Sequence, residues 1–125
     1  MKKPLVVSLA LMGVLLAAMP VSAKDGDVVA RGSCSAQADW KLKAAPRGGT
    51  MEIEFQVDSR RVGEVWDVTI ADNGSVVFTG SATTRGRSAS FTVRTTTPNQ
   101  AGIDTITGTA SNAATGEVCI ATVAA

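Results

Sequence analysis

Hydrophobic and polar residues alternate one by one over residues 34–44. Cys, Ala, Ala, Trp, Leu and Ala occupy the even positions, and Ser, Gln, Asp, Lys and Lys occupy the odd ones. A period of two places alternate side chains on opposite faces of a β-strand. The pattern therefore predicts a strand whose apolar face packs on the core. This strand carries one of the two cysteines and one of the two tryptophans.

Six more segments have strand patterns, at 51–58, 62–71, 75–83, 88–94, 103–110 and 118–123. In four of them the alternation predicts an inward face, made of Met51, Ile53, Phe55, Val57, Trp66, Val68, Ile70, Val76, Phe78, Gly80, Ala82, Ala89, Phe91 and Val93. The facing of the last two stays open. In the segment 103–110, Ile106 and Ala110 favour one face and Ile103 the other. Stretches rich in Gly, Pro, Asn or Thr, at 45–49, 72–74 and 95–102, are expected to be turns or loops.

Seven strands without any helical period are typical of an antiparallel β-sandwich of immunoglobulin-like type. A small closed barrel is the alternative. Two hallmarks of antibody domains are absent, because the chain has no Tyr and its cysteines lie on the first and last predicted strands. The prediction therefore concerns the all-β architecture and leaves the strand connections open.

The N-terminal residues have the pattern of an export signal. Residues 1–3 are Met-Lys-Lys, residues 5–18 are apolar, and residues 21–23 offer small side chains to signal peptidase. Residues 1–23 are therefore predicted to be a cleaved signal peptide, and residues 24–125 a single secreted domain with no membrane attachment after cleavage. A membrane anchor is the alternative, but Pro20 interrupts the apolar run.

The only two cysteines, Cys34 and Cys119, are predicted to form a disulfide, because export places them in an oxidising compartment. If every connection reverses the chain, the first and seventh strands start at the same end of the sandwich, and both cysteines meet there. The loops after the second, fourth and sixth strands lie at that end too.

These loops carry the candidate residues for binding an anion or a partner, Arg60, Arg61, Arg85 and Arg87. Arginine is suited to this role because its planar guanidinium pairs with phosphate, sulfate or carboxylate through two parallel hydrogen bonds. The alternative is that all four are ordinary solvated arginines of surface loops.

Composition argues against catalytic residues, cofactors and metals. The chain has no His and no CxxC motif, which removes the commonest catalytic base and zinc ligand. Glu52 and Glu54 could imitate a glycosidase carboxylate pair, but the wet face of a strand explains them. Asp25 and Asp27 lack the further ligands of a calcium loop. After residue 23, ten basic residues stand against eleven acidic ones and the aromatic side chains face inward, so nucleic acid is not an expected partner.

Several motifs follow Cys34 in a distinctive order: WKLK at 40–43, IEFQVD at 53–58, WDV at 66–68, VFTG at 77–80, SFTVR at 90–94 and GEVC at 116–119. This order resembles a group of small, uncharacterised exported proteins of actinobacteria. The resemblance implies secretion and a compact immunoglobulin-like β domain, and it brings no functional residues. In size and composition the chain is also similar to actinobacterial chromophore-carrying apoproteins, which have two disulfides where this chain has one cysteine pair.

The predicted function is that of a secreted, monomeric, non-catalytic binding module. Its expected partner is an extracellular protein or an anionic ligand at the cell surface. The alternative is a small-molecule carrier that uses an apolar cleft between the sheets.

Overall fold

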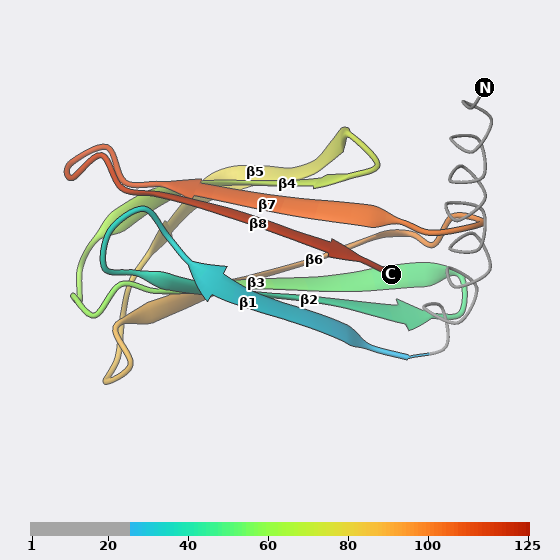
Figure 1. The fold of residues 1–125 in the computed structure, drawn as a ribbon, viewed down its shortest axis with the longest axis horizontal. Coiled ribbons are helices and arrows are strands. Elements are labelled where there is room, and N and C mark those ends of the chain that lie inside the picture. Colours follow the sequence, from blue (N-terminus) through green and yellow to red (C-terminus); the bar gives the residue numbers. More distant parts are fainter. Residues whose placement is uncertain (1–25) are drawn as a thin grey trace, which may run out of the picture.

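The computed structural model describes residues 26–125, so the predicted signal peptide lies outside the described residues. This part of the chain forms eight β-strands (Figure 1). They are β1 (Val28–Ser33), β2 (Asp39–Arg47), β3 (Thr50–Asp58), β4 (Val65–Asp72), β5 (Ser75–Thr83), β6 (Ser90–Pro98), β7 (Thr105–Ser111) and β8 (Val118–Ala124). Among these residues the structure holds no helix of the length and hydropathy needed to cross a membrane.

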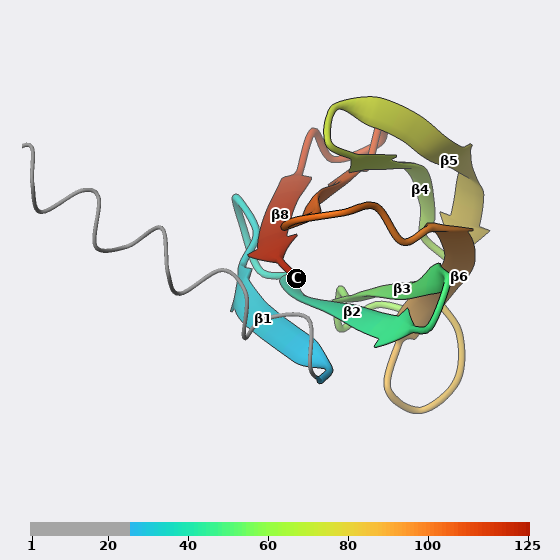
Figure 2. The ribbon, with the colours of Figure 1, turned by 90° about the vertical axis from the view of Figure 1, so that its right-hand side faces the viewer.

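The strands form two antiparallel sheets, with the orders β1-β2-β3-β6 and β5-β4-β7-β8. Figure 2 shows them end-on, one sheet stacked on the other. The largest side chains between them, Trp66, Phe55 and Leu42, are fully buried. The fold is therefore the predicted antiparallel β-sandwich, not the closed barrel, and it is compatible with an immunoglobulin-like type.

The structure has one strand more than the sequence predicts. β1 was not expected because its two valines are adjacent and its other inward positions hold only Ala and Gly. Cys34 lies just beyond β1 instead of inside a strand, and β2 begins only at Asp39. Residues 34–38 bend, with the Cys34 N–H donating to the Ala38 carbonyl at 2.8 Å. The alternating residues 34–38 therefore belong to a loop and not to a strand. The seven predicted strands correspond to β2–β8.

The predicted inward faces of β3, β4 and β6 are buried as expected. β5 is the exception. Val76 and Gly80 are exposed, Val76 over 61% of its surface, and Phe78 and Ala82 are only half-buried. The pairing of β4 with β5 shifts between Ile70 and Ala71, which leaves Val77 as an extra residue. Such a bulge reverses the facing of the residues on one side of it. The open question about the last two strands is answered by burial of the even positions of β7 and the odd positions of β8.

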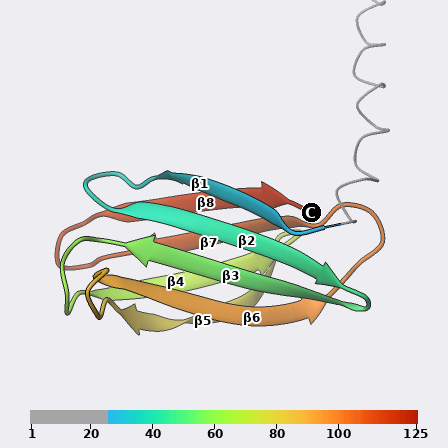
Figure 3. The ribbon, with the colours of Figure 1, turned by 90° about the horizontal axis from the view of Figure 1, so that it is seen from below.

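A disulfide joins Cys34 to Cys119, whose Cα atoms lie 4.3 Å apart. It ties the loop after β1 to β8, and so the edge of one sheet to the edge of the other. Both cysteines lie at the same end, as predicted, because seven strands run from β2 to β8 and every connection reverses the chain. The loops β1–β2, β3–β4, β5–β6 and β7–β8 consequently meet at one end of the sandwich, at the left of Figures 1 and 3. We call it the disulfide end.

Candidate functional site

The two arginine-bearing loops at the disulfide end are fastened to each other by Thr84. Its hydroxyl donates to the Arg61 carbonyl at 2.6 Å and accepts the Glu64 N–H at 2.9 Å. Its backbone exchanges hydrogen bonds with Gly63 and Glu64 at 2.8 and 2.9 Å. Thr84 is fully buried, so these bonds are shielded from water. The β3–β4 and β5–β6 loops therefore hold a fixed position relative to one another.

The four predicted arginines share this end but differ in their partners. Arg60 donates from Nη2 to Asp39 Oδ2 on β2 at 3.0 Å, and its N–H donates to Asp58 Oδ1 at 3.0 Å. Arg61, Arg85 and Arg87 are exposed, and no ion pair involves them within residues 26–125. Three guanidinium groups at this end are thus open to an external anion, while the fourth already has a carboxylate partner.

Glu117 binds the backbone of the β1–β2 loop at the disulfide end. Its Oε2 accepts the N–H groups of Ala36 and Ala38 at 3.1 and 2.8 Å. Ser35 adds a backbone bond to the Val118 carbonyl at 2.9 Å. A hollow of about 200 Å³ remains between these loops and Arg61. Glu117 therefore positions the β1–β2 loop, in addition to contributing charge near the arginines.

The outer face of the β1-β2-β3-β6 sheet, called the charged face below, carries a dense set of ionisable side chains. Their outward positions alternate with buried residues along each strand. The set comprises Arg31, Asp39, Lys41, Lys43, Arg47, Glu52, Glu54, Asp58 and Arg94.

Most charges on this face are neutralised by neighbours. Arg47 donates two hydrogen bonds to Asp27, at 2.7 and 3.2 Å, and Lys43 Nζ lies 3.6 Å from the same carboxylate. The hydrogen bond from Arg47 lowers the pKa of Asp27 below its ordinary value. These pairs tie the residue before β1 to β2.

Glu52 and Glu54, whose spacing could imitate a glycosidase pair, each have an arginine neighbour. Glu52 Oε1 lies 3.7 Å from Arg47 Nε, and Glu54 Oε2 lies 3.4 Å from Arg94 Nε. Ion pairing on the wet face of a strand accounts for both carboxylates. In residues 26–125, no group of three or more acidic, cysteine or histidine side chains is placed to hold a metal ion.

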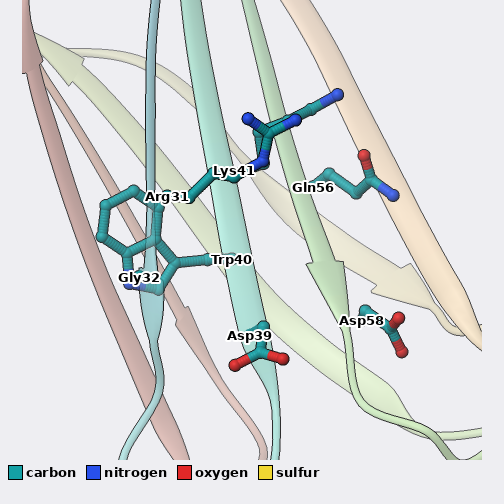
Figure 4. A pocket seen from close by; sticks show the side chains of 7 residues that line it. All are labelled: Arg31, Gly32, Asp39, Trp40, Lys41, Gln56 and Asp58. Atoms are coloured by element: carbon teal, nitrogen blue, oxygen red, sulfur yellow. The ribbon is translucent and has the colours of Figure 1, made fainter.

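Among the cations of the charged face, Arg31 and Lys41 are the exception. They stand directly opposite each other in the β1–β2 register, and Gln56 is opposite Lys41 on β3. Within the described residues neither cation has a carboxylate oxygen within 4.0 Å. They line a hollow of about 600 Å³ that also includes Asp39 and Asp58 (Figure 4).

Sequence reasoning missed both Thr84 and the Arg31–Lys41 pair. Thr84 looks like an ordinary strand-end threonine until the two loops are placed together. Arg31 and Lys41 are ten positions apart, and only the pairing of β1 with β2 makes them neighbours. Recognition of β1 as a strand would have been the one usable signal.

Comparison of the chain with protein-family models, with curated proteins and with solved structures finds no match. The function therefore has to be inferred from the residues themselves.

Proposed function

We propose that the protein is a secreted, non-catalytic binding module that holds an anionic partner at its disulfide end. The observation that carries the proposal is the fastening of two arginine-bearing loops by the buried Thr84, with Arg61, Arg85 and Arg87 left without carboxylate partners among residues 26–125. The disulfide at the same end limits motion of the β1–β2 loop beside them.

Rigid loops favour binding because less conformational entropy is lost when a partner docks. Guanidinium groups on such loops can each offer two parallel hydrogen bonds to a phosphate, sulfate or carboxylate. The partner that fits is an extracellular protein or surface polymer with several anionic groups, since three cations face it.

The alternative function, a small-molecule carrier, needs an apolar cleft between the sheets. Trp66, Phe55 and Leu42 fill the space between the sheets and have no exposed surface. The four hollows described for residues 26–125 lie instead at the loops and on the outer faces of the sheets. Surface binding is therefore the better supported function.

The test is retention on immobilised dextran sulfate, measured as the salt concentration at which protein collected from the culture medium elutes. The variant R61S/R85S/R87S removes the three arginines that have no ion-pair partner in the described part of the chain, and it keeps the Arg61 carbonyl that Thr84 binds. The control K43S/R47S/R94S removes three cations that already pair with carboxylates. We expect the first variant to elute at clearly lower salt than the wild type, and the control to stay close to it.

The exported chain has ten basic and eleven acidic residues, so its net charge alone does not favour a polyanion. Retention of the wild type would thus report a local site. The proposal fails if the wild type is not retained, or if both triple variants elute together.

A further inference from the structure

We infer that the Arg31–Lys41 hollow on the charged face is a binding site for an acidic sugar, a ligand that joins an anionic group to neighbouring hydroxyls. The site lies on the outer face of the sheet and uses none of the three open arginines of the disulfide end. A test of this site is therefore independent of a test of the function proposed above.

The two cations occupy directly opposite positions on neighbouring strands. Like charges directly opposite each other on adjacent strands destabilise a sheet. Arg31 and Lys41 have this arrangement, and the neutral Gln56 and Thr92 complete their row across β3 and β6. The other cations of the charged face each have a carboxylate neighbour. Because no carboxylate oxygen of the described residues lies within 4.0 Å of this cation pair, the pair is suited to an anion from outside.

The geometry of the pair suits an anion. In Figure 4 the Arg31 side chain reaches across β2 toward Lys41, while Gln56 extends from β3 on the same face. A guanidinium fork beside an ammonium group, with an amide N–H₂ nearby, matches the oxygen atoms of a carboxylate, sulfate or phosphate.

A row of two carboxylates adjoins the cation pair. Asp39 and Asp58 are opposite each other, one row nearer the disulfide end, or about 6.6–6.8 Å along the strands. Each accepts one hydrogen bond from Arg60 and keeps further lone pairs. Such carboxylates repel a bare anion but accept hydroxyl hydrogens. The site therefore selects a ligand with an anion at one end and hydroxyls at the other.

The hollow is large enough for such a ligand. Its volume of about 600 Å³ falls within the usual range of small-ligand sites, roughly 300–1,000 Å³. Because the hollow lies on the outer face of the sheet, it can take one sugar residue of a longer chain.

The experiment is a titration of the full exported protein followed by amide NMR shifts, with three probes. Methyl β-D-glucuronide carries the anion and the hydroxyls, methyl β-D-glucoside carries hydroxyls alone, and inorganic phosphate is an anion alone. We expect saturable shifts at Arg31, Lys41 and Gln56 with the glucuronide, none with the glucoside, and weaker binding of phosphate.

The variants R31S and K41T should each lower glucuronide affinity about tenfold or more, the effect of losing a charge-assisted hydrogen bond. The control R94S makes the same change of charge one row away and should bind as the wild type does. So should R61S/R85S/R87S, which separates this site from the disulfide end.

Each contrary result overturns the inference. No shifts with the glucuronide, or unchanged affinity in R31S and K41T, would mean that the cation pair is not a site. Equal binding of phosphate and glucuronide would leave an anion site without selectivity for sugars. Thermal unfolding of each variant shows whether the fold is retained.

Discussion

Three glycines in the strands lie against aromatic rings. A Cβ atom on Gly108 would come within 2.9 Å of the Phe55 ring, and one on Gly80 would come within 3.1 Å of Phe78. On Gly32 it would meet the Trp40 ring at 2.5 Å. These rings occupy the space that a side chain would need, and glycine is therefore required in β7 in particular, where Phe55 is fully buried.

Replacement of Gly108 by alanine should lower the free energy of unfolding by about 1–3 kcal/mol, the usual cost of overfilling a packed core. Phe55 cannot move aside because it is enclosed by the core. The matched change G80A should be nearly neutral, since Phe78 is only partly buried on an edge strand and can shift. Urea unfolding of both variants checks the difference. Equal destabilisation would mean that the edge strand is as tightly packed as the core.

The repulsion between Arg31 and Lys41 has its own signature in the ligand-free protein. K41T should raise the free energy of unfolding by about 0.2–1 kcal/mol, because it removes a like-charge pair across two strands. K43T should give no such gain, since Lys43 lies 3.6 Å from Asp27 and loses an attraction. The measurement is urea unfolding at low salt. Destabilisation of K41T as large as that of K43T would indicate a structural role for Lys41.

At the scale of elements, strict alternation predicted most strands, because a buried face leaves a period of two in the sequence. It failed where the backbone departs from a regular ladder. The bulge at Val77 turned Val76 outward, and the alternation of 34–38 lies in a bend whose Ala36 and Ala38 N–H groups donate to the distant Glu117. Pairing partners and long-range hydrogen bonds leave no local pattern, so the Arg31–Lys41 pair becomes apparent only when β1 is recognised as a strand beside β2.

Two strands contain a proline where the sequence predicts a loop. β2 continues through Pro46 and β6 through Pro98, although both segments were expected to be loops. Pro46 lies beyond Ala44, the last β2 residue paired with β1, so only β3 flanks it. Pro98 ends β6, an edge strand. A proline lacks a backbone donor, and such positions do not need one on the open side.

The disulfide closes a loop across 85 positions of sequence, between the edges of the two sheets. Loop-closure entropy gives a stabilisation of about 4–5 kcal/mol for that length. The variant C34A/C119A should therefore unfold at much lower urea concentration than the oxidised protein. Wild-type protein held reduced should match the variant, which separates the bond from the packing of Cys119. Coincident transitions for oxidised and reduced protein would contradict this expectation.

The two faces of the sandwich differ sharply in charge. The charged face carries nine ionisable side chains, whereas the outward positions of β5-β4-β7-β8 carry one, Asp67. The rest of that second face is Thr, Ser and small or aliphatic residues. The near-zero net charge of the chain does not reveal this difference. Electrostatic attraction draws a charged partner only to the charged face or to the disulfide end.

The bond between Cys34 and Cys119 also determines how the chain responds to mechanical tension. It turns residues 34–119 into a covalent ring, so tension applied before β1 and after β8 passes through the two sulfur atoms and cannot stretch what lies between. Lys41 and the arginine loops are inside this ring, whereas Arg31 is on β1, outside it. Under a pull on the chain, β1 is a strand that can peel away, and peeling it would separate Arg31 from Lys41.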